Sequence, residues 1–325
     1  MSDKFGKATT GEQVTELFAA ECKGMTVVIT GGNVGLGLET GRCLAKHGAH
    51  VVLCSRSVAN GQAAVEKIKK EQPDAVVSYM QLDLASLKTV RDFAAEFQKF
   101  HKTLNILINN AGIMACPKSL TSDGFESQFG VNHLAHFYLT TLLMPMLLKS
   151  ATKESPSRVV NLSSIAHLLA TPAGINFDDL QGDSYNPWER YSMSKLSNLL
   201  FTNELHRRYD SQNVTCVSVH PGMIAGTNLA KSVSAYAYMQ FMWALISAGS
   251  GGFMFLKERF KSIPEGVSTT LVAALDPKII HGAYYYDCAF NDGKKVHARY
   301  ADAEVGAKLW DVSEKLINEA VAKIQ

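Results

Sequence analysis

From Met25 onward, short apolar runs rich in β-branched residues alternate with longer segments of helical period. Strands that are buried on both faces read as nearly continuous apolar runs, so this alternation is typical of a parallel sheet covered by helices. The expected strands are 26–30, 50–54, 76–82, 105–109, 158–163, 214–219 and 283–286. The expected helices are 36–47, 58–71, 87–101, 124–149, 188–209, 265–275 and 302–323. The pattern predicts the α/β class, with a doubly wound parallel sheet of about seven strands flanked by helices.

The chain divides into a short extension and one large unit. Residues 1–24 precede the alternating pattern, and a helix near 10–18 could dock Val14, Leu17 and Phe18 on the body. No internal repeat or low-complexity linker interrupts residues 25–325, which we therefore expect to form a single domain.

Composition and charge narrow the function. The 325 residues are 46% hydrophobic and 19% charged, and the net charge is +2. No run of Lys and Arg forms a basic stripe, so we expect no nucleic-acid partner. The six cysteines show no CxxC pattern, and Cys54 and Cys216 lie inside apolar runs, as buried free thiols do. These features favour a reducing, cytoplasmic location.

A glycine-rich turn, TGGNVGLG, follows the first expected strand and leads into a helix. Its glycines allow a tight turn, and backbone N–H groups can approach a pyrophosphate at the positive end of that helix. The spacing is G-x-x-x-G-x-G and departs from G-x-G-x-x-G. In the first strand–helix unit of such a chain, the turn still indicates a Rossmann-like dinucleotide site. The residues expected to bind are Gly31, Asn33, Val34, Gly35, Leu36 and Gly37.

The second strand indicates which dinucleotide binds. Enzymes that use NAD usually place a carboxylate at the end of this strand to bind the ribose 2′-hydroxyl. Here no Asp or Glu occurs from Thr40 to Val65, and the strand ends at Ser55-Arg56. A guanidinium offers a planar fork for a 2′-phosphate, and the serine adds a hydroxyl. We therefore predict NADP(H); the alternative is that Arg56 is an ordinary solvated turn residue.

Two further strand ends carry polar or small residues. Asp83 and Leu84 follow the third strand, where the carboxylate could accept a hydrogen bond from the adenine amine or could cap the next helix. Asn110, Ala111 and Gly112 follow the fourth strand, where small residues would let the backbone lie against the adenosine ribose. The Asn110 amide could also tie strand ends together.

The helix expected at 124–149 carries Asn132, His133 and His136. The two histidines could bind a metal, but no third ligand with metal spacing follows, so core or surface histidines and no metal site are expected. An amide inside a helix has low propensity and needs a partner. We expect Asn132 to disturb the helix and to hold a water.

A serine, a tyrosine and a lysine complete the chemistry. Ser163 and Ser164 end the fifth strand, at the edge of a parallel sheet where ligands bind, and Ser164 is the better candidate. Tyr191 and Lys195 lie four residues apart, so a phenol and an ammonium project from one face of the next helix. Alone, this pair is typical of any amphipathic helix. The residues before it make it a candidate proton-transfer site.

Together these residues resemble the short-chain dehydrogenase/reductase family from about Met25 to Ile317. Within it the chain looks most like the NADP-dependent retinol dehydrogenases and the catalytic part of the WW-domain oxidoreductase. The motifs that carry the resemblance are NLSSIAH from Asn161, LSNLLFTNEL from Leu196, VHPG from Val219 and LWDVS from Leu309.

The resemblance implies a catalytic tetrad of Asn132, Ser164, Tyr191 and Lys195. It also implies that Tyr191, Lys195, Pro221, Gly222 and Thr227 bind the cofactor together with the glycine turn, Asp83 and the Asn110–Gly112 segment. Ser164 and Tyr191 are 191 − 164 = 27 residues apart, a longer spacing than is common, because of an insert at about 167–187 that also marks the retinol dehydrogenase branch. Thr227 is delayed by one position relative to the usual motif.

These roles define a mechanism. Ser164 would hold the carbonyl oxygen of a substrate, and Tyr191 would donate the proton during reduction or accept it during oxidation of the alcohol. A free tyrosine has a pKa of about 10, and we expect the ammonium of Lys195 to lower it. Lys195 would also bind the nicotinamide ribose, and Asn132 would hold a water that links Lys195 to solvent.

One segment points to the substrate. Residues 232–256 are 25 positions without a charge and include several aromatic residues. The helical part is too short for a membrane span, and a helix packed on the core is the plainer alternative. We expect a lid at about 224–256, hinged at Gly249, Gly251 and Gly252, over a lipophilic carbonyl such as a retinoid, a steroid, a lipid aldehyde or another hydrophobic ketone. Peripheral contact with an intracellular membrane is also expected.

Two other functions stay open. One is a dinucleotide-binding regulatory protein with little catalysis, although such proteins often lose the Tyr or the Lys. The other is a light-dependent pigment-precursor reductase, for which no residue speaks specifically. The expected partners are a lipophilic small molecule, a membrane surface and a second copy in a homodimer.

Overall fold

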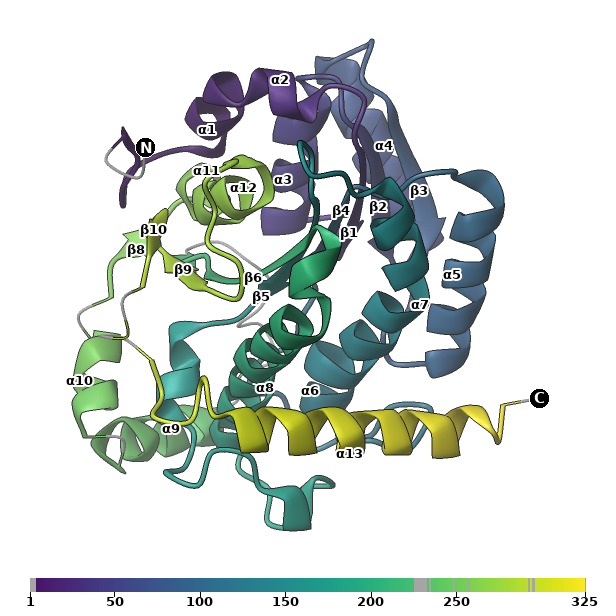
Figure 1. Cartoon of the computed structure of the whole chain (residues 1–325). Helices are drawn as coiled ribbons and strands as arrows, with labels where there is room; N and C mark the ends of the chain where they lie inside the picture. Colours follow the sequence, from purple (N-terminus) through teal and green to yellow (C-terminus); the bar gives the residue numbers. More distant parts are fainter. Residues whose placement is uncertain are drawn as a thin grey trace.

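The computed structural model describes residues 4–224, 233, 235–247, 249–256, 258–291, 293 and 296–324. Its centre is an eight-stranded sheet with the order β10-β9-β6-β5-β4-β1-β2-β3 (Figure 1). The strands are β1 (Thr26–Thr30), β2 (His50–Ser55), β3 (Val77–Gln81), β4 (Ile106–Asn109), β5 (Ser157–Leu162), β6 (Val214–His220), β9 (Tyr284–Tyr286) and β10 (Ala289–Phe290). All pair in parallel except β10. The prediction of a doubly wound α/β fold is confirmed.

The eighth strand, β10, escaped the sequence pattern because it is only two residues long. It pairs antiparallel with β9 across a two-residue turn. Asp287 and Cys288 form this turn with φ of 51° and 64°. Hairpins of this kind favour positive φ at both central residues but usually place Gly or Asn there, so the sequence lacked the usual turn signal.

The helices alternate with the strands as expected. The long ones are α3 (Gly35–Ala45), α4 (Val58–Glu71), α5 (Leu87–Phe100), α7 (Ala135–Ser150), α8 (Pro187–Tyr209), α9 (Ala235–Ser247), α12 (Ser268–Leu275) and α13 (Ala303–Val321). The short ones are α1 (Gly11–Leu17), α2 (Ala19–Cys22), α6 (Ser127–Phe129), α10 (Ser250–Leu256) and α11 (Ile263–Gly266). A π-helical turn covers Gly130–Leu134, and 3₁₀ turns cover Ile165–Leu169, Phe177–Asp179 and Asp210–Gln212. A two-stranded sheet joins β7 (Met223–Ile224) to β8 (Phe260–Lys261). No helix in the described ranges is long and apolar enough to cross a membrane.

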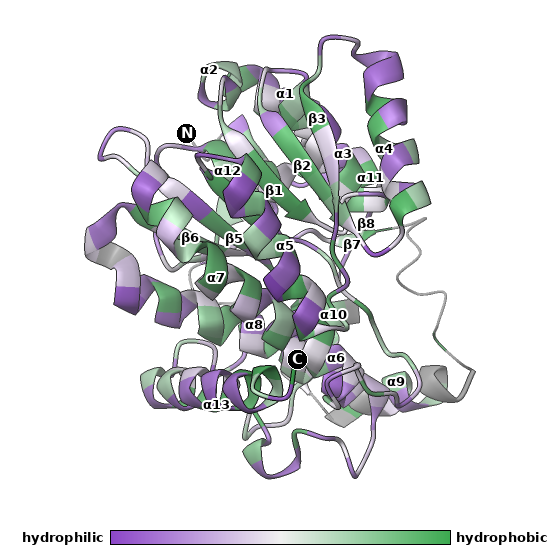
Figure 2. Cartoon of the chain, turned by 90° about the vertical axis from the view of Figure 1, so that its right-hand side faces the viewer, coloured by the Kyte–Doolittle hydropathy of each residue, from purple (hydrophilic) through white to green (hydrophobic). Residues whose placement is uncertain are grey.

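Two hydrophobic cores lie on opposite faces of the sheet. Val28 and Val52 point into the core that α5, α7, α8 and α13 cover. Their neighbours Val27 and Val51 point into the core that α1, α3, α4 and α12 cover. Because side chains alternate between the faces of a strand, burial on both sides explains the continuous apolar runs. Figure 2 shows β1 and β2 mostly in the hydrophobic colour, with α4 and α13 mixed.

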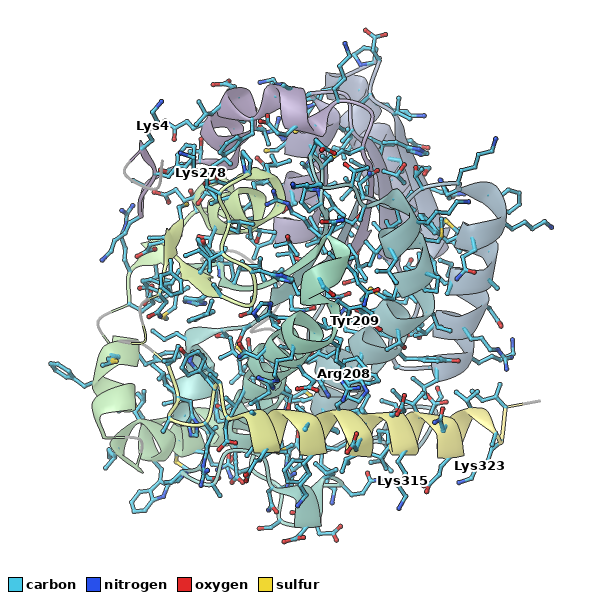
Figure 3. The ribbon with its side chains drawn as sticks, viewed as in Figure 1. Lys4, Arg208, Tyr209, Lys278, Lys315 and Lys323 are labelled. Carbon is cyan, nitrogen blue, oxygen red and sulfur yellow. The ribbon has the colours of Figure 1, made fainter. Side chains whose placement is uncertain are left out.

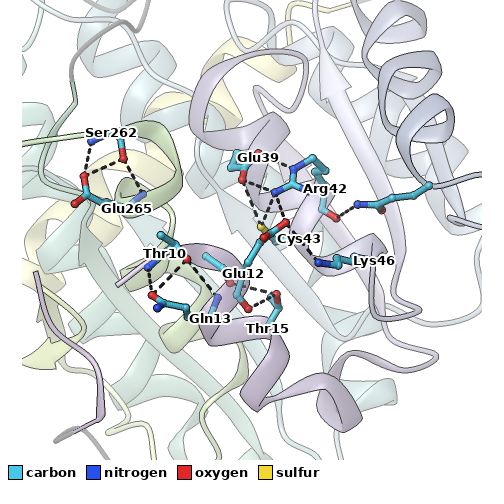
Figure 4. Close-up of polar contacts among 12 residues, drawn as sticks. Thr10, Glu12, Gln13, Thr15, Glu39, Arg42, Cys43, Lys46, Ser262 and Glu265 are labelled. Atoms are coloured by element: carbon cyan, nitrogen blue, oxygen red, sulfur yellow. Dashed lines mark hydrogen bonds and ion pairs between the residues drawn. The ribbon is translucent and has the colours of Figure 1, made fainter. Parts of the chain in front are cut away.

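The N-terminal segment packs on the body through α1. A capping box joins Thr10 and Gln13 at the start of this helix, and Val14 and Phe18 are buried. Leu17 is 42% exposed, so its expected docking is wrong. Glu12 forms an ion pair with Arg42 of α3 at 2.9 Å (Figure 4).

The C-terminal helix α13 covers the outer side of α7 and α8. Trp310 packs against Phe137 of α7 with ring centroids 4.7 Å apart and against Phe201 of α8. The guanidinium of Arg208 lies 4.2 Å from the centre of the Trp310 ring (Figure 3). This layer leaves α8 buried along most of its length.

Candidate active site

The expected site residues gather at the carboxyl ends of the parallel strands, near the point where the strand order reverses between β1 and β4. Doubly wound sheets bind their ligands in the crevice at this point. The glycine turn follows β1, the segment 110–112 follows β4, and Ser164 follows β5.

The glycine turn joins β1 to α3. Gly31 and Gly35 have φ of 64° and 58°, which L side chains rarely adopt. A Cβ at Gly37 would overlap the carbonyl of Gly31, and a Cβ at Gly31 would lie 3.1 Å from Ala111. The backbone of the turn therefore packs directly on the segment after β4, and α3 begins at Gly35 with its N–H groups toward the turn.

Thr30 and Asn110 fix this packing. The N–H groups of Asn110 and Ala111 donate to Oγ1 of Thr30 at 2.9 and 3.0 Å. The Asn110 amide donates to the carbonyl of Thr30 at 2.7 Å. Of the two roles expected for Asn110, the structure shows the tie between strand ends.

The end of β2 carries the two residues expected at the ribose. Ser55 is buried, and its hydroxyl donates to the carbonyl of Ser57 at 3.1 Å. Arg56 is exposed and forms no ion pair with any described residue. Glu39 of α3 and Glu12 of α1 are bound to Arg42.

Asp83 follows β3, and one carboxylate oxygen accepts a hydrogen bond from the N–H of Ala85 at 2.9 Å. The other oxygen has no hydrogen-bond partner in the described part of the chain. Leu84 is buried in the core beside α5. The helix α5 instead begins after Ser86, and Asp123 accepts from its first N–H, that of Leu87.

Tyr191 and Lys195 lie on one face of α8, and both are buried. Nζ of Lys195 lies 5.7 Å from the centre of the Tyr191 ring and donates to the carbonyl of Leu162 at 3.1 Å. Ser164, at the start of the next 3₁₀ turn, places its hydroxyl near that of Tyr191, and this contact favours the phenolate. The structure thus brings together the serine, the phenol and the ammonium.

Burial dominates the pKa values of both titratable groups. It raises the pKa of Tyr191 to about 12, against the opposing effect of the nearby Ser164 hydroxyl. It lowers the pKa of Lys195 to about 8. The shift at Tyr191 has the opposite direction to the one expected from a neighbouring ammonium, because the cost of charging a buried phenol outweighs that attraction in the chain alone.

Asn132 lies in the π-helical turn before α7, so the expected disturbance of the helix is present. Its amide donates to the carbonyl of Ile113 and to Oγ of Ser194, both at 2.9 Å, and accepts from the N–H of Ile113 at 2.9 Å. A Cβ at Gly112 would lie 3.2 Å from Oδ1 of Asn132 and 3.4 Å from Nζ of Lys195. Asn132 and Lys195 therefore face the same small space.

Pro221 and Gly222 follow β6 and lead into β7. Gly222 has a φ of 98°, and a Cβ there would lie 2.7 Å from the side chain of Lys261. Lys261 is buried and pairs with Asp287 at 2.6 Å. The side chain of Lys261, held by this ion pair, therefore packs against the turn at Gly222. Thr227 lies outside the described residues.

The insert between Ser164 and Tyr191 is tied to α8 by Arg190. This buried guanidinium pairs with the carboxylate of Asp179 at 2.6 Å and also donates to the Asp179 carbonyl. At the other end of the insert, the hydroxyl of Tyr185 donates to the carbonyl of Cys116 at 2.7 Å. The insert thereby contacts the segment that follows β4.

Several residues that support the site were not predicted from the sequence. Thr30, Ser194 and Arg190 each adjoin a residue that was singled out, and each holds the site through the contacts described above. Asn198 also donates to the carbonyl of Leu162, at 3.0 Å. Adjacency to a motif is the only sequence feature that could have indicated them.

Comparisons with known proteins decide the family. The model of the short chain dehydrogenase family matches residues 25–178. Short-chain dehydrogenase TIC 32 A of Brassica napus is 41% identical over 320 residues, which cover 96% of this chain and 94% of that protein. Retinol dehydrogenase 12 of Mus musculus is 42% identical over 298 residues, which cover 90% of this chain and 86% of that protein. The chain belongs to the short-chain dehydrogenase family.

A solved structure supports the same assignment. A protein of Mycobacterium Paratuberculosis is 36% identical, with a TM-score of 0.68, over 92% of this chain and 97% of its own. This short-chain dehydrogenase lies in the branch that includes the retinol dehydrogenases. It is an oxidoreductase that acts on CH–OH groups, and its family uses NAD(P).

The residues of this short-chain dehydrogenase fit such a dinucleotide. Gly31 and Gly35 supply the positive φ that the tight turn needs, and α3 begins there with its positive end. Asp83 keeps an acceptor, and Arg56 keeps its guanidinium exposed.

Proposed function

We propose that this protein is an NADP(H)-dependent oxidoreductase that interconverts a lipophilic aldehyde or ketone and its alcohol, with Tyr191 as the acid and base. The observation that carries the proposal is the group of the half-buried Ser164 with the buried Tyr191 and Lys195 at the carboxyl edge of the sheet. These three side chains supply what carbonyl reduction needs at the oxygen atom, namely a hydrogen-bond donor and a proton donor.

The dinucleotide, when bound, supplies or accepts the hydride at carbon. Ser164 would donate a hydrogen bond to the carbonyl oxygen as negative charge develops there. Tyr191 would transfer its proton to that oxygen. With its pKa raised to about 12 by burial, the phenol is protonated at neutral pH and ready to donate in the reducing direction.

Lys195 and Asn132 would return the proton. The ammonium lies against the Tyr191 ring and would also bind the nicotinamide ribose. Both N–H groups of the Asn132 amide already have partners, so the water expected there would have to donate to an oxygen of Asn132. We propose a relay from solvent through this water and Lys195 to Tyr191.

Three further groups would hold the cofactor. Arg56 and Ser55 would bind the 2′-phosphate, and the absence of an acid at the end of β2 supports NADP(H) over NAD(H). Asp83 and Leu84 would border the adenine, and Asn110, Ala111 and Gly112 the ribose. We also propose that Pro221, Gly222 and Thr227 contact the nicotinamide.

The substrate would be lipophilic because of what covers the catalytic helix. Trp188 lies one turn before Tyr191 on α8, and its ring packs at a tilt against Phe241 of α9, with ring centroids 4.5 Å apart. Phe241 in turn contacts Phe255 of α10 at 5.2 Å, and Leu245 is buried. An apolar helix pair thus packs beside the catalytic tyrosine. We propose that residues 224–256 act as a lid over a retinoid-like or steroid-like carbonyl.

The outer face of the proposed lid would contact a membrane. Met239, Met242, Trp243 and Ile246 of α9 are each more than half exposed and recur at helical spacing. No charged residue occurs from 232 to 256, whereas Lys231 and Lys257 bracket that stretch in sequence. Helices of this kind lie in the plane of a membrane interface. We therefore propose a cytoplasmic protein with peripheral contact to an intracellular membrane.

A substrate screen tests the function. The oxidation of NADPH is followed with retinoid, steroid and long-chain aldehydes and ketones, and with short polar carbonyls as controls. We expect turnover with the lipophilic compounds and a lower kcat/KM with the polar ones. NADPH binding without turnover of any carbonyl would favour a regulatory protein. Turnover that needs light would favour a pigment-precursor reductase.

The homodimer expected from the sequence stays a prediction. Sedimentation equilibrium of the NADPH-bound protein measures it directly. In the described structure α13 covers the outer side of α7 and α8. A partner copy could therefore contact the outer side of these two helices only if it displaced α13.

A further inference from the structure

His136 occupies a position between the glycine turn and Asn132. It lies in the first turn of α7, directly after the π-helical turn, and its ring is buried. Nδ1 lies 3.1 Å from the carbonyl oxygen of Asn132, and Nε2 lies 2.9 Å from Oγ1 of Thr30. One imidazole therefore spans from the end of β1 to a residue of the proposed catalytic tetrad.

The hydrogen bonds of Thr30 decide which nitrogen of His136 carries the proton. A hydroxyl has two lone pairs and one proton. The N–H groups of Asn110 and Ala111 occupy both lone pairs of Oγ1. The hydroxyl proton has two acceptors in reach, Nε2 of His136 at 2.9 Å and the carbonyl of Ile108 at 3.5 Å. The second distance is long for an O–H···O bond, so the proton points at Nε2.

This arrangement fixes the ring as the neutral Nδ1–H tautomer. Nε2 accepts from Thr30, and Nδ1–H donates to the Asn132 carbonyl. The opposite tautomer would set the Nδ1 lone pair against that carbonyl and would bring a third donor to Thr30. The protonated ring would bring the same third donor.

Burial and one nearby charge both oppose protonation of the ring. Burial, with a smaller contribution from the positive charge of Lys195, lowers the pKa of His136 to about 4, against the opposing effect of the hydrogen bond to the Asn132 carbonyl. The neighbouring His133 faces the other way, with Nε2 2.9 Å from Oγ of Ser313 on α13, and burial lowers its pKa to about 3. Neither histidine is a metal ligand in this arrangement, and no group of metal-binding side chains occurs among the described residues.

We propose that His136 is a positioning residue, a permanently neutral imidazole that couples the glycine turn and the Asn110–Ala111 segment to Asn132. The inference deepens the proposed function, because it assigns to this contact the alignment of the proton relay with the bound dinucleotide. Asn132 in turn bonds Ser194 at 2.9 Å, one residue before Lys195. A displacement of the glycine turn would therefore move Asn132 through the two hydrogen bonds of the His136 ring.

A nuclear magnetic resonance measurement tests the tautomer without any substrate. The protein is labelled with ¹⁵N-histidine, loaded with NADPH, and its imidazole signals are recorded between about pH 5 and pH 8. His136 is assigned by the signals that disappear in His136→Asn. We expect an unprotonated Nε2 and a protonated Nδ1 that do not change over this range. A ring that titrates there, or the Nε2–H tautomer, overturns the proposal.

A pair of variants at Thr30 tests the coupling. Thr30→Ser keeps the hydroxyl, and Thr30→Val removes it with little change in shape. We expect the tautomer to persist in Thr30→Ser and to be lost in Thr30→Val. We also expect Thr30→Val and His136→Asn each to lower kcat by about tenfold to a hundredfold, the cost of a misplaced catalytic group. This loss should exceed any change in the KM for NADPH.

His133→Asn is the matched control, since it removes a buried histidine that bonds α13 and not the turn. It should lower the melting temperature and leave kcat unchanged. If His136→Asn keeps wild-type kcat, the positioning role is wrong even when the tautomer is as expected. If no carbonyl is turned over by the wild type, the proposed function fails, and the tautomer and its dependence on Thr30 still test the link.

Discussion

At the scale of single residues, the proposed chemistry depends on how burial changes two titratable groups. Burial raises the pKa of Tyr191 from an ordinary value of about 10 to about 12, so its phenol stays protonated well above neutral pH. Lys195 loses its proton more easily than a free lysine because its pKa falls to about 8. Of these two groups, Lys195 is therefore the one whose charge changes near physiological pH before the dinucleotide binds.

The pH profile of carbonyl reduction should show this. The ratio kcat/KM for NADPH reports the enzyme before the dinucleotide binds. This ratio should fall as pH rises through about 8, because Lys195 then loses its charge. Arginine stays charged throughout, so Lys195→Arg should lose this limb although its kcat is lower. A flat wild-type profile from about pH 7 to pH 9.5, or the same limb in Lys195→Arg, would contradict the assignment.

The same shift has a consequence for stability. Between pH values of about 8 and 10.5, unfolded Lys195 binds a proton that folded Lys195 does not. The contribution of this residue to the free energy of unfolding should therefore rise with pH across that window and be constant below it.

The proposed preference for NADP(H) rests on Arg56. Arg56→Ala should raise the KM for NADPH far more than the KM for NADH, because only NADPH carries the 2′-phosphate that the guanidinium would bind. Steady-state kinetics with both cofactors measure the two changes, and Arg42→Ala is a control because that guanidinium is held by Glu12 and Glu39. Equal changes in both KM values for Arg56→Ala would show that the residue is an ordinary surface arginine.

At the scale of elements, the insert before α8 is joined to that helix by one buried ion pair, Arg190 with Asp179. Asp179→Asn would leave the buried Arg190 without its charged partner, a change that typically costs about 3–5 kcal/mol when a buried pair is broken. We expect faster proteolysis within 170–187 and a higher KM for the carbonyl, with the KM for NADPH unchanged.

Asp183→Asn is the control for the insert. This carboxylate is 94% exposed and lies 3.9 Å from Lys118, so its loss should have little effect. Equal proteolysis rates in wild type, Asp179→Asn and Asp183→Asn would mean that Arg190 does not hold the insert.

Most elements could be predicted because strands buried on both faces leave a direct pattern in the sequence. The first strand, Thr26–Thr30, has the predicted bounds, and the helix at 58–71 does too. The π-helical turn at Gly130–Leu134 could not be predicted beyond the disturbance expected at Asn132, because it depends on contacts with Ile113 and Ser194 from distant segments. The direction of the Tyr191 pKa shift failed for the same reason, since burial depends on the whole fold.

At the scale of the whole molecule, two tryptophans should differ in what they contribute to stability, because one is buried in the core and the other is exposed on the surface. Trp310 is 6% exposed between α7, α8 and Arg208, whereas Trp243 is 70% exposed on α9. Trp310→Ala should lower the free energy of unfolding by about 3–5 kcal/mol. Trp243→Ala should change it by less than about 0.5 kcal/mol. Urea unfolding followed by circular dichroism measures both.

The same pair tests membrane contact. Trp243→Ala should weaken binding to vesicles that contain anionic lipid, since Trp243 belongs to the exposed apolar face of α9. Trp310→Ala, where it remains folded, should bind them as the wild type does. Sedimentation with vesicles measures the bound fraction, and equal binding by the wild type and Trp243→Ala would place any membrane contact elsewhere.

Tyr191→Phe tests the central claim most directly, because it removes one hydroxyl from a buried ring. Binding of NADPH is measured by its fluorescence, and oxidation of NADPH is followed with the best lipophilic carbonyl from the screen. We predict that the variant binds NADPH as the wild type does and has no measurable turnover. Appreciable turnover by Tyr191→Phe would contradict the assignment of Tyr191 as the proton donor.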